Sequence, residues 1–270
     1  MPVVVHLSDL HFGRVDERLL QPLVSAVQAA RPDVVVVSGD LTQRAQPCEF
    51  AAARALLERL PSPRIVVPGN HDVPLYNLVD RWLRPLALFR DYIEADPAPR
   101  FTSAGLWIVG INTARSMVIK NGRINRQQMA VIRSTLQAAP ADALRVVVTH
   151  HPFDAGDKLG DHNRVGRADM AMRLFEECGV DLLLSGHLHV AYSGAAAPLE
   201  EAAPRPGPLA VSAGTATSTR VRCEPNEFNV LRVDKQHVDV ARLTWSEPDG
   251  EFRAAARSSF VRDGGPWRRA

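Results

Sequence analysis

Short, nearly continuous runs of Val, Ile and Leu recur along the first two thirds of the chain. Such runs are typical of β-strands that are buried on both faces of a sheet. We therefore expect strands in six segments, which are Val3–Leu7, Val34–Val37, Ile65–Val67, Leu106–Ile111, Val146–Thr149 and Val180–Leu184.

Between several of these segments, apolar residues recur with the spacing of an amphipathic helix. Two predicted helical faces consist of Leu20, Leu23, Val24 and Val27, and of Phe50, Ala53, Leu57 and Leu60. A third helix is expected to start at Asn125, because this side chain can cap a helix and Gln128 stands three residues later. A fourth runs from about Asp169 to Cys178, where Gly179 is expected to stop it. Strands that alternate with helices predict an α/β core.

The segment from Leu78 to Ile93 also has a helical pattern, but Pro85 is expected to break or kink it. After Gly186 the pattern changes, because the predicted strands follow one another without helices. These strands are Leu209–Ala213, Phe228–Val233, Val238–Trp245 and Phe252–Phe260. Asp234–Gln236 is expected to form a hairpin turn between two of them. We expect this part of the chain to add an antiparallel section to a sheet.

The chain shows no internal repeat and no clear linker. We therefore expect a single domain over residues 1–262, followed by a flexible tail over residues 263–270 that is rich in Gly and Arg.

Charge and cysteine content argue against several classes of protein. The formal net charge of the 270 residues is +2, which is too weak to indicate nucleic-acid binding. The three cysteines, Cys48, Cys178 and Cys223, form no CxxC pair, so we expect reduced thiols in a cytoplasmic protein and no disulfide framework. The N-terminus has neither a basic start nor a long apolar stretch, so no signal peptide or membrane span is expected.

Clusters of polar residues follow five of the predicted strands. They are Ser8–His11, Ser38–Asp40, Pro68–Asp72, His150–Pro152 and Ser185–His189. In open α/β sheets, ligands bind beyond the carboxyl ends of strands, so these segments are expected to bring Asp, Asn and His to one edge. Oxygen and imidazole donors without thiolate favour Mn, Fe, Zn or Co. A carboxylate can bridge two ions roughly 3.5–4 Å apart, and such a pair activates a hydroxide nucleophile against a phosphoryl group.

Five ordered motifs in these clusters resemble those of the calcineurin-like metallophosphoesterase superfamily. They are Asp9-Leu10-His11, Gly39-Asp40, Gly69-Asn70-His71-Asp72, His150 and Gly186-His187-Leu188-His189. Within the superfamily, the chain most resembles the bacterial class III cyclic-nucleotide phosphodiesterases. The resemblance implies a four-layer αββα sandwich, in which two mixed β-sheets are flanked by helices.

The resemblance also implies a role for each motif residue. One metal ion would be held by Asp9, His11, Asp40 and His189, and the other by Asp40, Asn70, His150 and His187, with Asp40 bridging the two. His71 would contact the substrate rather than the metals. Asp72 would orient His71 by accepting a hydrogen bond from its ring.

The other histidines need separate interpretation. His151 competes with His150 as a ligand, but neighbours along a strand point to opposite sides, so only one is expected to face the metals. The resemblance favours His150. We expect His6, inside the first strand, to be a packed structural residue, and His237, just after the hairpin turn, to be solvated. His162 lies in a loop between two motifs, where it either reaches the substrate or is merely exposed.

Arginines also stand just beyond the ligand segments. They are Arg14, Arg44, Arg115, Arg164 and Arg167. A guanidinium group binds phosphate with two parallel hydrogen bonds, so at least one of the five is expected to contact the substrate. The alternative for each is a solvated surface charge.

The expected activity is the hydrolysis of a small phosphodiester, with 3′,5′-cyclic nucleotides as candidates, by attack of a metal-bridged hydroxide. A nuclease fits less well, because the chain is nearly neutral and has no room for a DNA-binding domain. A phosphoprotein phosphatase would have Asp-Arg-Gly where this chain has Leu41–Arg44. A non-catalytic scaffold on this fold would have lost ligands, and none is missing. A nucleotide or lipid-precursor pyrophosphatase stays open and would need an apolar patch near the site. The resemblance also suggests a homodimer.

Overall fold

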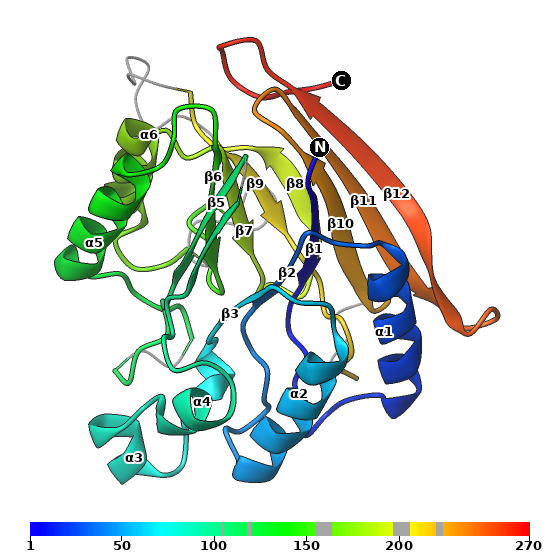
Figure 1. Cartoon of the computed structure of the whole chain (residues 1–270). Coiled ribbons are helices and arrows are strands. Elements are labelled where there is room, and N and C mark those ends of the chain that lie inside the picture. Colours follow the sequence, from blue (N-terminus) through cyan, green and yellow to red (C-terminus); the bar gives the residue numbers. More distant parts are fainter. Residues whose placement is uncertain (104, 118–119, 155–163, 197–205, 220–223) are drawn as a thin grey trace.

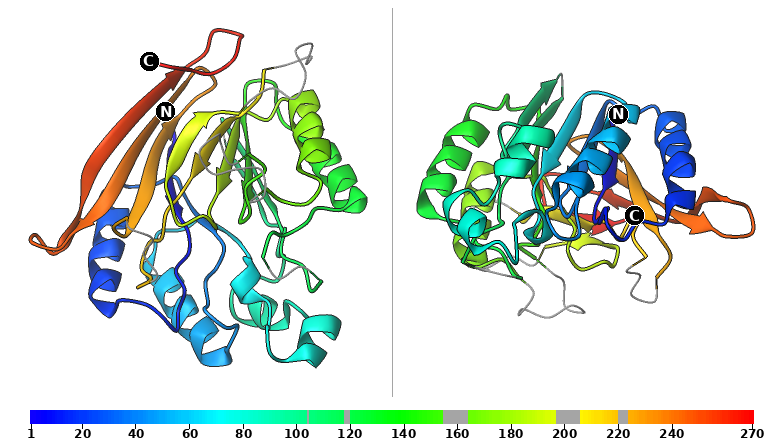
Figure 2. Two further views of the ribbon diagram at one scale, coloured as in Figure 1. Left: turned by 180° about the vertical axis from the view of Figure 1, so that it is seen from behind. Right: turned by 90° about the horizontal axis from the view of Figure 1, so that it is seen from below.

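Two β-sheets stacked face to face form the centre of the molecule, and helices cover the outer face of each (Figures 1 and 2). This computed structural model describes the chain except for residues 104, 118–119, 155–163, 197–205 and 220–223. The predicted four-layer αββα sandwich of two mixed sheets is confirmed.

The first sheet joins the start of the chain to its end. In spatial order its strands are β13 (Arg268–Arg269), β12 (Glu251–Val261), β11 (His237–Ser246), β10 (Glu227–Val233), β1 (Val3–Leu7), β2 (Val34–Ser38) and β3 (Arg64–Val67). β1, β2 and β3 are parallel, so their carboxyl ends lie at one edge of the sheet. β10, β11 and β12 add the expected antiparallel section. The predicted hairpin turn closes where the Asp234 N–H donates to the His237 carbonyl at 2.8 Å.

The second sheet is parallel in its centre and antiparallel at both edges. In spatial order its strands are β4 (Arg100–Ser103), β5 (Leu106–Ile111), β6 (Leu144–Thr149), β7 (Leu182–Ser185), β9 (Leu209–Ser212) and β8 (Tyr192–Ala195). The sequence placed β9 in the antiparallel part, but it pairs parallel to β7. The edge strands β4 and β8 carry polar and partly exposed residues, so they lack the apolar run by which the other strands were predicted.

The described helices are η1 (Glu17–Leu19), α1 (Leu20–Ala29), α2 (Pro47–Arg59), η2 (Asn70–Asp72), α3 (Leu78–Leu83), α4 (Ala87–Tyr92), α5 (Arg126–Gln137) and α6 (Ala168–Cys178). Their boundaries confirm the predicted signals. The Asn125 side chain caps α5 by accepting from the Gln128 N–H at 2.8 Å, Gly179 ends α6 with a φ of 65°, and Pro85 separates α3 from α4. No helix in the described residues has the length and apolar composition that a membrane span requires.

Alternate residues of the central strands face different cores. In β1, Val5 and Leu7 pack toward α1 and α2, whereas Val4 packs between the two sheets. In β2, Val35 packs toward the helices and Val34 packs between the two sheets. A third core lies between the second sheet and helices α5 and α6. Because both faces of each central strand are buried, the strands consist mainly of apolar residues.

The end of the C-terminal tail packs against the first sheet. Trp267 is buried, its indole N–H donates to the Asp181 carbonyl at 3.1 Å, and the Arg262 guanidinium lies 4.4 Å from the centre of its ring. Arg268–Arg269 then pair with β12. One aromatic residue thus anchors a segment of polar composition, which the expectation of a tail did not include.

Candidate metal centre

The predicted ligands gather where five strands end. β1, β2 and β3 deliver residues from one sheet, and β6 and β7 deliver residues from the other (Figure 1). The side chains that meet there are Asp9, His11, Asp40, Asn70, His150, His187 and His189. All of them are buried except Asn70, which is partly exposed.

One group of potential ligand atoms belongs to Asp9, His11 and His189, and these atoms lie within 4.8 Å of one another. The Nε2 atoms of His11 and His189 are each 3.5 Å from Oδ1 of Asp9. The two imidazole rings are stacked, with their centres 5.1 Å apart. Two imidazole nitrogens and one carboxylate oxygen therefore converge on a single point.

A second group is built around Asp40 and His150. Nε2 of His150 lies 3.2 Å from Oδ2 of Asp40 and 3.3 Å from Nδ1 of His187. The same Oδ2 atom lies 3.8 Å from Nε2 of His11, which belongs to the first group. Asp40 thus stands between the two groups, in the position that a bridging carboxylate requires.

The hydrogen bonding of these side chains fits metal ions. Among the described residues, Asp9 Oδ1, His11 Nε2 and Asn70 Oδ1 are buried without any hydrogen-bond partner. Buried polar atoms are rarely left unpaired, so such atoms require an explanation. The atoms on the far side of the ligands are satisfied: Oδ2 of Asp9 accepts from Ser8 Oγ at 2.6 Å, and Nδ1 of His150 donates to the Ser38 carbonyl at 2.7 Å. Such outer partners orient the ligands of metal sites.

Several of these residues also have strained backbones. Asp9, His11, Asp40, His187 and His189 all have φ between 51° and 72°. This left-handed conformation costs a residue with a Cβ about 1–2 kcal/mol. Such strain concentrates at functional sites, where the surrounding structure holds the residue in place.

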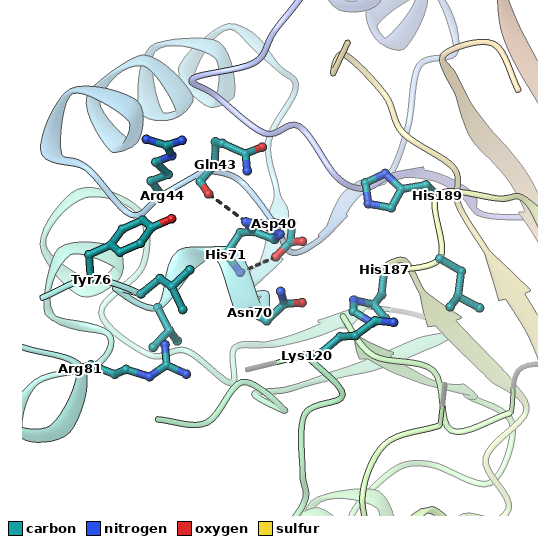
Figure 3. Close-up of a pocket in the computed structure, with 13 residues that line it drawn as sticks. Asp40, Gln43, Arg44, Asn70, His71, Tyr76, Arg81, Lys120, His187 and His189 are labelled. Carbon is teal, nitrogen blue, oxygen red and sulfur yellow. Dashed lines mark hydrogen bonds between the residues drawn. The ribbon is translucent and has the colours of Figure 1, made fainter. Parts of the chain in front are cut away.

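His71 has a different partner from the one predicted. Its Nδ1 donates to the Gln43 carbonyl at 2.8 Å, and its backbone N–H donates to Oδ1 of Asp40 at 2.9 Å (Figure 3). The Asp72 carboxylate instead accepts from the backbone N–H of Gly69 at 2.8 Å and of Thr42 at 2.9 Å. The expectation that Asp72 orients the His71 ring is therefore wrong. Asp72 ties the loop after β2 to the loop after β3, because its carboxylate accepts from backbone N–H groups of both loops.

A family model described as calcineurin-like phosphoesterase matches residues 2–191. The chain belongs to this family. Two curated relatives are similar to it: a glycerophosphodiester phosphodiesterase from Enterobacter lignolyticus and a cAMP/cGMP dual specificity phosphodiesterase from Mycobacterium tuberculosis. The first is 36% identical over 31% of this chain and 34% of its own length. The second is 28% identical over 69% of this chain and 61% of its own length, so the match spans less than two thirds of either relative.

Solved structures support the fold. A purple acid phosphatase from yellow lupin seeds superposes with a TM-score of 0.70 at 13% identity, covering 97% of this chain and 54% of that one. A dimetal phosphatase from Danio rerio superposes with a TM-score of 0.65 at 13% identity, covering 91% of this chain and 99% of that one. The αββα sandwich of this phosphoesterase is thus the fold of known metallophosphatases.

The charges in the centre of the phosphoesterase favour cations. Burial raises the pKa of Asp40, but His150, together with His11 and His71, more than offsets this effect, and the pKa lies well below its usual range. Burial acts in the same way on Asp9, whose pKa is held low by His189. Burial and the charge of His150 lower the pKa of His187 to about 3, so its ring is neutral and one of its nitrogens can act as a ligand. Burial lowers the pKa of His150, but Asp40 overcomes this and raises it to about 9, so a metal ion bound there displaces a proton.

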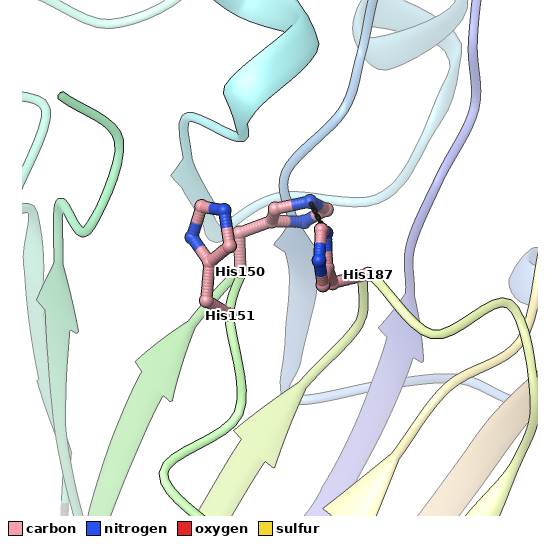
Figure 4. Close-up of side chains that lie close together, drawn as sticks. All are labelled: His150, His151 and His187. Carbon is pink, nitrogen blue, oxygen red and sulfur yellow. Dashed lines mark hydrogen bonds between the residues drawn. The ribbon is translucent and has the colours of Figure 1, made fainter. Parts of the chain in front are cut away.

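His151 lies closer to the centre than predicted. Ligand atoms of His150, His151 and His187 lie within 4.8 Å of one another (Figure 4). Nδ1 of His151 is bonded to Thr113 Oγ1 at 2.8 Å, and its Nε2 is buried without a partner among the described residues. The expectation that only one of the two neighbours faces this region is wrong, because β6 ends at Thr149 and its alternation does not extend to residues 150 and 151.

Two other histidines have the expected surroundings. His6 is fully buried, with Nε2 bonded to Ser38 Oγ at 2.9 Å, and His237 is exposed beside Asp234. His162 lies outside the described residues. His6 therefore has a structural role, and His237 is a surface residue.

The predicted arginines differ in their surroundings. Arg44 lines a pocket of about 370 Å³ in front of the ligands (Figure 3). Arg115 bonds to Gln128, Arg164 bonds to Asp169, and neither lines this pocket. The remaining two, Arg14 and Arg167, do not line it either.

Sequence reasoning missed several residues of the pocket. Besides the predicted Asp40, Arg44, Asn70, His71, His187 and His189, the pocket is lined by Gln43, Val73, Leu75, Tyr76, Arg81, Lys120 and Leu188. Arg81 and Lys120 add positive charge to it, and Tyr76 adds an aromatic ring. Neither Arg81, one of several charged residues in the predicted helical segment, nor Lys120 carried a distinguishing signal in the sequence.

A close approach at Gly186 offers a test of how tightly the centre is built. A methyl group at this position would overlap Ser8 Oγ and lie 2.7 Å from Oδ2 of Asp9. Gly186→Ala is expected to lower the free energy of unfolding by about 1–3 kcal/mol, as overpacking does, and to reduce metal content. Urea unfolding and elemental analysis measure the two effects. Gly265→Ala is the control, since its methyl group would meet no atom within 4 Å. Equal behaviour of the two variants would contradict the packing described here.

Proposed function

We propose that this phosphoesterase hydrolyses small phosphodiesters, including 3′,5′-cyclic nucleotides, at a centre of two metal ions. The observation that carries the proposal is the pair of ligand groups that meet at Asp40 beside the pocket, in which Asp9 Oδ1, His11 Nε2 and Asn70 Oδ1 are buried without a hydrogen-bond partner among the described residues. The names of the curated relatives, both phosphodiesterases, favour diesters over other phosphate esters.

In this proposal the two groups of side chains divide between the ions. Asp9, His11 and His189 would hold one ion, Asn70, His150 and His187 would hold the other, and Asp40 would be a ligand of both. Nitrogen and oxygen donors of this kind suit Mn, Fe, Zn or Co. When bound, the ions supply Lewis acidity toward the phosphoryl oxygen and lower the pKa of a water nucleophile. His151 is an additional candidate ligand for the ion near His150 and His187.

The remaining residues act on the substrate directly. Because Nδ1 of His71 donates to the Gln43 carbonyl, Nε2 is the atom at which His71 would hold a proton for the leaving oxygen. Arg44 and Lys120 line the same pocket and would face the non-bridging phosphate oxygens. Asp72 would fix the position of the His71 backbone through its bonds to Thr42 and Gly69.

Preference for diesters over monoesters tests this assignment. For metal-reconstituted protein, kcat/KM is expected to be higher for bis(p-nitrophenyl) phosphate than for p-nitrophenyl phosphate. The two substrates are a matched pair, because they share a leaving group and differ in the charge of the phosphate. A tenfold preference for the monoester, about 1.4 kcal/mol in the barrier, would place the enzyme among the monoesterases instead. Cyclic AMP and cyclic GMP, assayed beside linear dinucleotides, then separate cyclic-nucleotide hydrolysis from nuclease activity.

A further inference from the structure

Helix α3 has its polar and apolar faces reversed. Its buried residue is Arg81, which is 6% exposed, whereas its large apolar residues face outward. Leu78, Val79, Trp82 and Leu83 are 63%, 66%, 59% and 77% exposed. Buried cations and exposed large apolar side chains are both unusual in a soluble domain, and their combination marks a functional surface.

The exposed apolar residues of the described chain are concentrated in this one segment. Six of the ten large hydrophobic residues that are exposed lie between Leu75 and Leu83. The six are Leu75, Tyr76, Leu78, Val79, Trp82 and Leu83, and we call them the apolar surface. Val131 on α5 and Met170 on α6, by contrast, are isolated, as single exposed apolar residues commonly are.

The segment is firmly built into the fold. The Arg81 guanidinium donates to the carbonyl of Ser116 at 2.8 Å and to that of Pro74 at 2.9 Å. The Asn77 side chain caps the helix by accepting from the Asp80 N–H at 3.1 Å. A helix held by such bonds presents its apolar side chains in fixed positions, so their exposure is not the result of fraying.

The apolar surface continues directly into the catalytic pocket. Leu75 and Tyr76 line the pocket together with Arg81, and the Arg44 guanidinium lies 5.9 Å from the centre of the Tyr76 ring (Figure 3). Cations and an aromatic ring therefore stand between the metal ligands and the exposed face of α3. A molecule with an anionic phosphate at the metals could extend an apolar group along this path.

We infer that the apolar surface binds a long apolar group of the substrate, so that the preferred diesters are amphiphiles: one side of the phosphate is esterified to a lipid-like alcohol. This inference rests on the proposed function and narrows its substrate class. The occupant is the substrate itself, because the surface shares Leu75, Tyr76 and Arg81 with the pocket. The cations of the pocket meet the phosphate, and α3 meets the chain attached to it.

A series of p-nitrophenyl alkyl phosphodiesters, from methyl to octyl and below the concentration at which they form micelles, tests the inference. For the wild type, kcat/KM is expected to rise at least tenfold from methyl to octyl, mainly through a lower KM, because each buried methylene adds affinity. Leu78→Gln and Trp82→Gln, both exposed positions, are expected to flatten the series while leaving hydrolysis of the methyl ester unchanged. Val131→Gln on α5 is the matched control and should keep the wild-type slope.

A binding measurement supports the kinetic one and does not depend on turnover. Titration with octylphosphonate is expected to shift the fluorescence of Trp82 to shorter wavelength, and Trp82→Phe should remove that shift. Methylphosphonate at the same concentration should produce none.

Several results would overturn the inference. One is a flat alkyl series in the wild type together with the absence of any octylphosphonate response; if the methyl ester is still hydrolysed, the proposed function survives. Another is a wild type that is a dimer by light scattering and becomes a monomer in Leu78→Gln and Trp82→Gln, while the dependence of kcat/KM on alkyl chain length is unchanged. That result would make α3 an interface between two copies. Binding to phosphatidylcholine vesicles without chain-length selectivity would likewise contradict it. If no diester is hydrolysed at all, the proposed function fails, and the phosphonate titration alone decides the inference.

Discussion

Replacing Asp40 with alanine is expected to abolish diester hydrolysis and to lower metal occupancy at both sites together. Asp40 is the side chain that reaches both ligand groups, at 3.2 Å from His150 and 3.8 Å from His11. Without its charge the imidazoles lose the carboxylate between the two ions, and a loss in rate of at least about 10³-fold is expected. Steady-state kinetics and elemental analysis of the same preparation measure both effects.

Asp9→Ala separates a shared ligand from an unshared one. Asp9 lies beside His11 and His189, so its removal is expected to empty mainly one site and leave about one ion per chain. Asp239→Ala, which removes an exposed carboxylate on β11, should keep both ions and full activity. If Asp40→Ala retained two ions, or lost the same single ion as Asp9→Ala, Asp40 would not be the bridge.

His71→Ala is expected to reduce hydrolysis of cyclic nucleotides far more than hydrolysis of nitrophenyl esters. A ribose alkoxide needs a proton to leave, whereas nitrophenolate leaves without one. General acid catalysis is worth ~10²–10⁴ in rate, and a loss of that size is expected with cyclic AMP. Metal content should be unchanged, because Nδ1 of His71 is bonded to the Gln43 carbonyl and its backbone N–H to Asp40.

The comparison of the two substrates identifies the role of His71. Equal losses on both would show that His71 stabilises charge on a non-bridging oxygen instead of protonating the leaving group. A lost metal ion, or no change in rate, would show that His71 does not act on the substrate. His237→Ala, an exposed histidine on β11, controls for the general effect of removing an imidazole.

Much of the fold could be predicted because its central strands are buried on both faces. β1 and β2 are apolar except at His6 and Ser38, since successive residues enter different cores, and such runs are easy to recognise. The edge strand β8, with the sequence Tyr-Ser-Gly-Ala, has no such pattern. The parallel pairing of β9 with β7 was missed for another reason, because no described helix lies between these two strands to indicate a crossover.

The candidate site was predictable as a set of residue types at strand ends, but its internal contacts were not. Regular alternation failed at His151, since the strand ends at Thr149. The expected bond between His71 and Asp72 failed because both lie in the tight turn η2, where Asp72 faces the backbone of Thr42. Arg81 and Lys120 lie outside the motifs, so only the folded chain shows that they line the pocket.

The central claim is that activity needs two metal ions held by the residues around Asp40, and metal titration of the chelated protein tests it most directly. Removal of metal should abolish diester hydrolysis. Stepwise return of Mn²⁺ should then restore activity in proportion to the second ion bound, up to two per chain. Full activity after exhaustive chelation, or saturation of activity at one ion per chain, would contradict the claim.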